Sequence, residues 1–243
     1  MARTAAALII GNEILTGKIR DENLFYLGRE LFLLGIALRR VVLCPDELDV
    51  IADDLTHLRQ THDLVFTSGG VGPTHDDVTL DGVARSFGRR LVRSSRIESM
   101  IHDFWKDRVT AGHLRMADLP EGAELQSRPD FPWPVIRVDN VYVLPGVPAL
   151  FRVTFHTLRD QLGADAPFVS RALYTRCDEG EIADLLEKVM AAHPEVAIGS
   201  YPTWRDPEVK VKLTFDGRDE GQVIAALEDC QGRLPSGVVV RRE

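Results

Sequence analysis

The stretch that decides the fold lies at residues 64–79 and reads LVFTSGGVGPTHDDVT. Its first residues, 64–67, form an apolar run that is typical of a buried strand, and a helical pattern follows at 79–87. Ligands of open α/β sheets bind beyond the carboxyl ends of the strands, where such a strand-to-helix loop lies. The stretch therefore predicts an α/β fold with a binding site after this strand.

Between residues 5 and 161 the chain alternates short aliphatic runs with amphipathic stretches. This pattern predicts a mostly parallel sheet with helices on both faces. Residues 119–134 are rich in proline and polar side chains, and we expect them to leave the sheet. We expect strands at 5–10, 37–44, 64–67, 135–138 and 141–144, and helices at 21–34, 46–58, 79–87, 96–107 and 147–162.

The rest of the chain follows a different order of elements. Its pattern predicts a strand, a helix, two strands, a helix and a strand, which is the split βαβ arrangement of a small α+β domain. Gly163 and Pro167 interrupt the pattern before it begins, so we place a first domain at 1–165 and a second at 166–243. The expected elements are 168–175, 179–192, 196–200, 209–215, 220–233 and 238–241.

Composition excludes several classes of protein. The formal net charge of −8 disfavours a nucleic-acid partner, because a polyphosphate backbone would be repelled. No stretch approaches the roughly 20 apolar residues of a membrane span. Cys44, Cys177 and Cys230 lack the spacing of a disulfide framework or a zinc site, and they are interpreted as small buried side chains in a reducing compartment. A cytoplasmic location is expected.

Three glycines after the third strand, Gly69, Gly70 and Gly72, predict an anion site. Glycine permits positive φ and close approach, so that main-chain N–H groups can converge on a phosphate. The helix expected near Val78 would add the positive end of its dipole. The alternative is a tight turn whose polar residues only cap that helix. We favour the ligand site because Pro73, together with a threonine, a histidine and two aspartates, is packed into the same stretch.

Asp76 and Asp77 suggest a cation in this site. A carboxylate beside a phosphate is repulsive unless positive charge lies between them, and Mg²⁺ or a transition-metal substitute suits one or two carboxylates with phosphate oxygens and water. Adjacent side chains point in different directions, so we expect one aspartate to serve the site and the other mainly to cap the helix. Asp77 is the preferred metal ligand, with Asp76 as the second candidate.

Two other loops follow expected strands. The first, residues 11–18, reads GNEILTGK, but its spacing and Ile19 do not fit a P-loop. The glycine loop at 69–72 does not form a dinucleotide fingerprint either, because His75 stands where the third glycine of that motif should be. Glu13 could hold a metal or water and Lys18 a phosphate, although ordinary surface charges explain both. In the other loop, Pro148 suits a helix start, and Gly146 provides either a close approach or only a turn.

These loops give the chain a specific resemblance to a known family. The chain resembles the molybdopterin-binding-like (MoaB/Mog) domain of the competence/damage-inducible protein A (CinA) family, and more closely the N-terminal domain of eukaryotic FAD synthase. The matching segments are residues 11–17 with Asn23, then 69–79 and 143–148, and in the second domain 199–202 and 209–213. Glu13 and Asp77 also match acidic residues of the more remote molybdopterin adenylyltransferases.

The resemblance implies a three-layer αβα domain that hydrolyses the pyrophosphate bond of ADP-ribose or FAD with a divalent metal, in a dimer or larger homo-oligomer. No amidohydrolase or FAD-synthesising domain is expected in these residues, so the first domain is the candidate for the chemistry. The alternatives are a molybdopterin adenylyltransferase, which the added small domain disfavours, and a non-catalytic nucleotide-binding or pterin-binding module.

The resulting hypothesis assigns three catalytic carboxylates, Asp77, Asp76 and Glu13, of which Asp77 and Asp76 bind the metal. The expected partner is a small molecule, namely a nucleotide such as ADP-ribose or FAD, or a pterin-like compound. The substrate-binding residues are expected to be Gly11, Asn12, Thr16, Lys18, Asn23, Ser68, Gly69, Gly70, Gly72, Pro73, Thr74, His75, Gly146 and Pro148.

Overall fold

A computed structural model describes residues 3–128, 131–163, 166–204 and 206–243. The chain divides into two compact units, Met1–Asp165 and Ala166–Glu243. None of the helices in the described ranges is long and apolar enough to cross a lipid bilayer.

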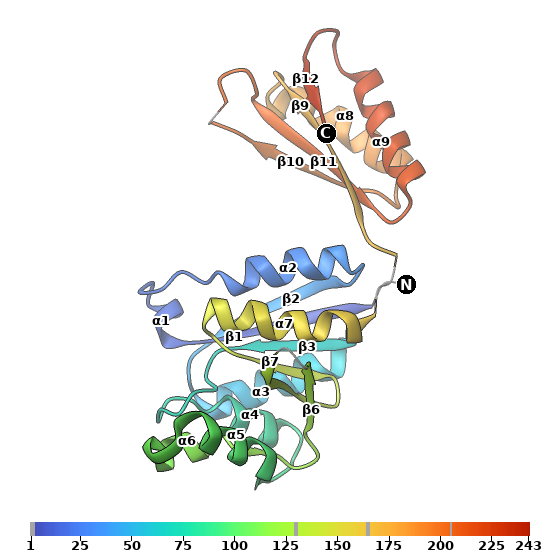
Figure 1. Cartoon of the computed structure of the whole chain (residues 1–243). Coiled ribbons are helices and arrows are strands. Elements are labelled where there is room, and N and C mark those ends of the chain that lie inside the picture. Colours follow the sequence, from blue (N-terminus) through green and yellow to red (C-terminus); the bar gives the residue numbers. More distant parts are fainter. Residues whose placement is uncertain (1–2, 129–130, 164–165, 205) are drawn as a thin grey trace. The chain divides into compact units, whose positions relative to one another are not determined.

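The first unit is built on a six-stranded sheet (Figure 1). Its strand order is β2-β1-β3-β8-β7-β6, in which the first four strands run parallel and the last two pair antiparallel. A short two-stranded sheet joins β4 and β5. The strands are β1 (Thr4–Ile10), β2 (Ala37–Cys44), β3 (Leu64–Ser68), β4 (Leu91–Arg93), β5 (Asp118–Pro120), β6 (Glu124–Arg128), β7 (Phe131–Val138) and β8 (Val141–Leu144).

Helices cover both faces of the large sheet, as the alternation of apolar segments predicts. On one face, α2 and α7 bury Leu27, Leu31 and Phe155 against the strands, and on the other α3 buries Ile51 and Leu55. The three-layer αβα fold is confirmed. The helices are α1 (Asn12–Leu15), α2 (Asn23–Leu33), α3 (Leu48–Thr61), α4 (Thr79–Ser86), α5 (Ser95–Trp105), the 3₁₀ turn η1 (Lys106–Arg108), α6 (Ala111–Arg115) and α7 (Pro148–Leu162).

The expectation that residues 119–134 leave the sheet is confirmed for residues 119–123 but wrong for the described residues from Glu124 onward. β6 is the edge strand of the large sheet, and β7 begins at Phe131, before the expected start of its strand. Pro134 is tolerated because it lies where the pairing of β7 with β6 shifts register and before β8 begins to pair, at Ile136. A proline at this position therefore takes no hydrogen-bond donor away from the pairing of β7 with either neighbouring strand.

The second unit has the predicted small α+β fold. Its sheet has the order β10-β11-β9-β12, each neighbouring pair is antiparallel, and its helices bury apolar side chains against the strands, among them Leu173, Phe215 and Leu227. This order is that of a split βαβ domain. The elements are β9 (Val169–Thr175), α8 (Glu179–Ala192), β10 (Ala197–Pro202), β11 (Val211–Gly217), α9 (Glu220–Arg233) and β12 (Val239–Arg242).

The three cysteines are free and buried, as the sequence predicts for small apolar side chains. Burial raises the pKa of the Cys44 thiol to about 12 and that of Cys230 to about 11. Such thiols stay protonated at neutral pH and are poor nucleophiles and metal ligands.

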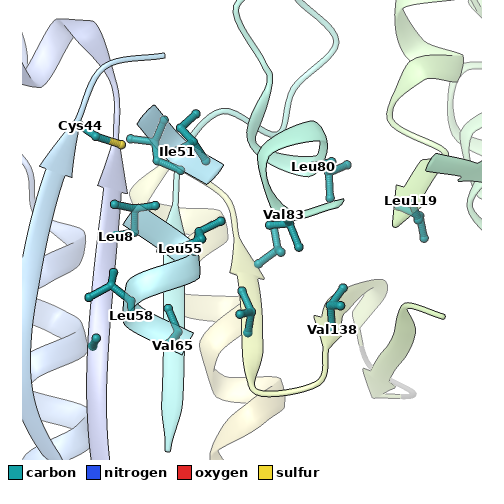
Figure 2. Packing of buried hydrophobic residues seen from close by; sticks show 14 of the residues in the cluster. Leu8, Cys44, Ile51, Leu55, Leu58, Val65, Leu80, Val83, Leu119 and Val138 are labelled. Carbon is teal, nitrogen blue, oxygen red and sulfur yellow. The ribbon is translucent and has the colours of Figure 1, made fainter. Parts of the chain in front are cut away.

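Close packing of α3 against α4 sets the position of the helix that follows the glycine loop. Figure 2 shows Ile51, Leu55 and Leu58 of α3 among the side chains of the sheet, with Val83 of α4 nearby. Gly82 of α4 faces Ile51 so closely that a Cβ built on the glycine would overlap the Cγ2 atom of Ile51. The approach of the two helices therefore requires the absence of a side chain at residue 82.

We expect Gly82→Ala to lower the free energy of unfolding of the first unit by about 1–3 kcal/mol, because the added methyl group overpacks the helix interface. The matched control is Gly28→Ala in α2, where a Cβ would meet only Leu38, at 3.8 Å. That control should gain about 0.5–1 kcal/mol from helix propensity. Urea unfolding, followed by the fluorescence of Trp105 and Trp133 in a Trp204→Phe background, measures both. A Gly82→Ala protein as stable as the parent would contradict the packing argument.

Candidate functional site

The sheet brings three loops together at the carboxyl ends of its central strands. β1 lies between β2 and β3, so the connections from β1 and from β3 leave the sheet in opposite directions. Such a topological switch point is the usual ligand position in an open α/β sheet. The loops after β1, β3 and β8 correspond to the three segments singled out in the sequence.

Backbone contacts join the three loops. Gly69 has φ +104°, and a Cβ there would overlap the carbonyl oxygen of Ile10 at the end of β1. A Cβ on Gly146 would lie 3.2 Å from the Cα of Gly69. The Gly69 N–H also donates to the carbonyl of Leu144, at 3.3 Å. Gly69 thus packs directly between neighbouring main-chain segments, which leaves no room for a side chain.

Asn23, the first residue of α2, joins the loop after β3 to the loop after β8. Its Nδ2 donates to Ser68 Oγ at 2.9 Å and to the Gly146 carbonyl at 2.7 Å, and the residue is only 3% exposed. Its Oδ1 has no hydrogen-bond partner within the described ranges. The structure therefore brings Asn23, Ser68 and Gly146 together, although they are far apart in the sequence.

The glycine loop leaves three consecutive main-chain N–H groups available. Within the part of the chain that is described, the N–H groups of Gly70, Val71 and Gly72 have no hydrogen-bond acceptor. The carbonyls of Gly69 and Gly70 accept hydrogen bonds from the hydroxyl and the N–H of Thr79, at 2.9 and 3.0 Å, which fixes the loop on the first turn of α4. Consecutive unpartnered amides of this kind form an anion-binding concavity.

This set of amides is smaller than the set of substrate-binding residues expected between Gly69 and Thr74. Gly69 donates its N–H within the sheet, and Thr74 donates its N–H to Asp77 Oδ2 at 2.8 Å. Pro73 has no N–H to give. The anion-binding capacity of the loop therefore belongs to the amides of residues 70–72.

Both aspartates converge on the hydroxyl of Thr74. The hydroxyl oxygen lies 2.6 Å from Asp76 Oδ1 and also contacts Asp77 Oδ2. The bond from Thr74 lowers the pKa of Asp76 below its ordinary value, so this exposed carboxyl is ionised at neutral pH. One hydroxyl carries one proton and cannot satisfy both carboxylates. The pair concentrates negative charge and carboxylate oxygens at one point beside the amides.

The expectation that one aspartate caps α4 is wrong. The N-cap residue is Val78, and no side chain accepts a hydrogen bond from the first turn of the helix. Asp76 and Asp77 instead close a turn with Thr74, whose carbonyl accepts the N–H of Asp77 at 3.3 Å. Asp77 also lies over Gly72, where a Cβ would come within 2.7 Å of its Oδ2.

The loop after β1 contains the short helix α1, which the sequence analysis did not predict. Glu13 folds back over Gly11, so that a Cβ on this glycine would lie 2.7 Å from both carboxylate oxygens. The Asn12 N–H donates to Asp46 Oδ2 at 2.8 Å, and the Thr16 hydroxyl donates to the Asn12 carbonyl at 2.7 Å. These polar groups build the loop itself.

Not every predicted residue joins one cluster. Among the described residues, no three acidic, histidine or cysteine side chains are arranged to hold a metal, so Glu13 does not complete a three-carboxylate centre with the two aspartates. Lys18 is exposed, and His75 is 95% exposed with Nδ1 3.9 Å from Asp76. Pro148 starts α7, as predicted from its missing N–H.

One cation near the loop was missed by the sequence analysis. Arg115, at the end of α6, donates from Nη2 to the carbonyl of Thr74 at 2.6 Å. A Cβ on Gly112 in the same helix would lie 3.0 Å from the carbonyl oxygen of Pro73. Thus α6 packs on the glycine loop and places a guanidinium group on the carbonyl of Thr74. No local motif connects these residues, because they lie in separate segments of the chain.

Comparisons with known proteins match both units. Residues 6–164 match the family described as the probable molybdopterin binding domain, and residues 167–243 match the middle domain of FAD synthase. A protein of Archaeoglobus fulgidus is 33% identical over 93% of this chain and 95% of its own length. A probable FAD synthase of Caenorhabditis briggsae is 34% identical over 88% of this chain but 46% of its own length. The chain thus spans about half of that relative.

Two further relatives belong to the CinA group. A CinA-like protein of Syntrophus aciditrophicus is 30% identical over 93% of this chain and 57% of its own length. The crystal structure of CinA from Thermoplasma acidophilum, whose function is given as unknown, is 30% identical and superposes with a TM-score of 0.61. The superposed region covers 66% of this chain and 98% of the chain from Thermoplasma acidophilum. The fold of the first unit is therefore shared with a solved structure.

The hydrogen bonds of Asn23 predict a loss of ligand binding when its amide is removed. We expect Asn23→Ala to lower the free energy of unfolding by about 1–3 kcal/mol, because two hydrogen bonds are lost, and to weaken the binding of ADP-ribose, because the loops after β3 and β8 are no longer joined. Chemical unfolding and calorimetric titration measure the two effects.

The matched control is Asn140→Ala. Asn140 also donates twice from Nδ2, to the carbonyls of Arg59 and His62 at 2.9 Å each. It directly precedes β8, so it lies at the amino end of that strand, whereas Asn23 contacts the loop at its carboxyl end. This variant should lose comparable stability while its affinity for ADP-ribose stays that of the parent. Equal losses of affinity in both variants would show that Asn23 acts only through overall stability.

Proposed function

The chain belongs to the family of the probable molybdopterin binding domain, and on this basis we propose that it hydrolyses the pyrophosphate linkage of a nucleotide such as ADP-ribose or FAD with the help of a divalent cation. The observation that carries the proposal is the run of unpartnered amides at residues 70–72 beside Asp76 and Asp77, at the switch point of the sheet. Main-chain amides bind phosphate oxygens, and the adjacent carboxylates call for a cation.

The donor set fits a hard divalent cation. Asp76 and Asp77 bring carboxylate oxygens to the Thr74 hydroxyl, and magnesium completes its shell with phosphate oxygens and water, so it does not need a third protein carboxylate. When bound, such a cation supplies the positive charge that stabilises the developing charge on phosphate oxygens. Mn²⁺ or Co²⁺ accepts the same oxygen ligands.

The chain's own residues have separate tasks in this proposal. The amides of residues 70–72 bind the non-bridging oxygens of one phosphate and hold it in place during attack by water. Asp77, which is fixed by the Thr74 N–H and packed over Gly72, is the main cation ligand, and Asp76 is the second. Arg115 adds positive charge beside the same loop. Water adds across the phosphoric anhydride, so that two monophosphates leave.

Relatives support the substrate class. Probable FAD synthases are among the relatives, and the family is described as the probable molybdopterin binding domain, which supports a nucleotide-like or pterin-like ligand. A non-catalytic module that binds a nucleotide or pterin is the second candidate, because the unpartnered amides of residues 70–72 can hold a phosphate without any hydrolysis. Turnover separates the two functions.

The test is a screen of the purified protein with ADP-ribose and FAD in the presence of Mg²⁺, Mn²⁺ or Co²⁺. We expect AMP with ribose 5-phosphate from the first substrate and AMP with FMN from the second, and no turnover after chelation by EDTA. Asp77→Asn should reduce kcat by about 10²–10³-fold, which is typical when one group that stabilises transition-state charge is removed.

The matched control for Asp77→Asn is Asp160→Asn, which removes an exposed carboxylate from the last turn of α7, at the end of that helix opposite to the loop after β8. Its activity should equal that of the parent. If Asp77→Asn turns over as fast as the parent, the assigned role of Asp77 is wrong. If ADP-ribose and FAD bind tightly but no metal supports cleavage, the protein is a binding module instead.

A further inference from the structure

Four aromatic rings meet beside the glycine loop. Trp105 is the central ring: it stacks on His113 of α6 at 4.5 Å between centroids and contacts Phe104 at 4.6 Å and Trp133 of β7 at 5.8 Å. Phe104 also meets Trp133, at 6.2 Å. We call these four residues the aromatic cluster. Its members come from α5, α6 and β7, so tertiary packing creates the cluster.

The aromatic cluster is physically joined to the candidate phosphate site. His113 lies in α6 between Gly112, which packs on the Pro73 carbonyl, and Arg115, which donates to the Thr74 carbonyl. The ring of His113 is itself held by a hydrogen bond between its Nδ1 and the N–H of Thr110 at 3.1 Å. Figure 1 shows α6 at the same end of the sheet as α1. α6 therefore connects the aromatic cluster with the loop that carries the amides of residues 70–72.

Core packing explains only part of the cluster. Trp105 and Trp133 are partly buried against the same hydrophobic core as α3 and α4, and hydrophobic packing accounts for them. Phe104 is 62% exposed even though it contacts both tryptophans. An exposed aromatic ring that is rigidly backed by two others loses little conformational freedom when a planar molecule stacks on it.

Exposed side chains of both charges flank the aromatic cluster, because Asp103 and Asp107 alternate with Lys106 and Arg108. Lys106 and Arg108 in η1 are exposed and form no ion pair with any described residue, whereas Arg90 and Arg93 nearby are paired with Glu121 and Asp118. Positive charge next to aromatic rings suits a ligand that is both anionic and aromatic.

We propose that the aromatic cluster is the subsite for the planar ring of the nucleotide substrate, either a nucleobase or a flavin, whose phosphates lie on the amides of residues 70–72. This inference rests on the proposed function, because it extends the same site toward α6. Phe104 supplies the exposed stacking face, and Lys106 and Arg108 lie around it. The subsite selects nucleotides over phosphate compounds that lack an aromatic ring.

The experiment compares two probes that share phosphates but differ in the ring: FAD and inorganic pyrophosphate, each with Ca²⁺ in place of the metals of the activity screen, so that binding is measured apart from turnover. Calorimetry measures both dissociation constants. Phe104→Ala should raise the Kd of FAD by about 5–100-fold, as expected for the loss of one stacking contact, and should leave the Kd of pyrophosphate unchanged. The matched control is Phe25→Ala on α2, which removes another exposed phenyl ring, 79% exposed, and should change neither value.

Fluorescence provides a second readout. In a Trp204→Phe background the remaining indoles are Trp105 and Trp133, both in the aromatic cluster, so FAD should quench them and pyrophosphate should not. If Phe104→Ala weakens both probes equally, or neither, the subsite is refuted. If the parent protein binds pyrophosphate as tightly as FAD, the ring subsite fails while the phosphate site stands. If the parent binds neither probe, the proposed function itself fails, and the ring subsite with it.

Discussion

The structure of the site depends on one steric constraint, which is the contact of Gly69 with the main chain on both sides. The carbonyl of Ile10 approaches this glycine so closely that no side chain fits, and a Cβ on Gly146 would lie 3.2 Å from the Cα of Gly69. This contact holds the ends of β1, β3 and β8 at fixed positions, and Asn23 adds hydrogen bonds to Ser68 and Gly146. The direction of the loop at residues 70–72, and hence the availability of its amides, follows from this junction.

An acidic chain can offer an anion site because the positive potential comes from main-chain dipoles rather than from net charge. Fixed N–H groups need no reorganisation to face a phosphate, and they cost no burial of a cationic side chain. The same loop carries Asp76 and Asp77 on the Thr74 hydroxyl, so it is positive at the amides and negative a few residues later. This alternation favours a phosphate only together with a cation, which links substrate binding to metal binding in the proposed reaction.

Local patterns were sufficient for the layers of the fold and for the position of the glycine loop. The aliphatic runs of β1, β3 and β8 and the three- and four-residue spacing of leucines in α2 are determined by burial of one face, so they are visible in the sequence. The pairing of β7 was not predicted, because prolines disfavour strands. The sequence does not show that Pro134 lies where neither neighbouring strand pairs with it.

Contacts within the site were harder to predict, because they join segments that no periodicity relates. Arg115 reaches Thr74 across 41 residues, and Trp105 meets Trp133 only after β7 has joined the sheet. Thr79, rather than an aspartate, fixes the loop on α4, because its hydroxyl and its N–H are both used by glycine carbonyls. All of these residues belong to the first unit, while the second unit has its own core around Phe215. The proposed chemistry is therefore a property of the first unit's loops.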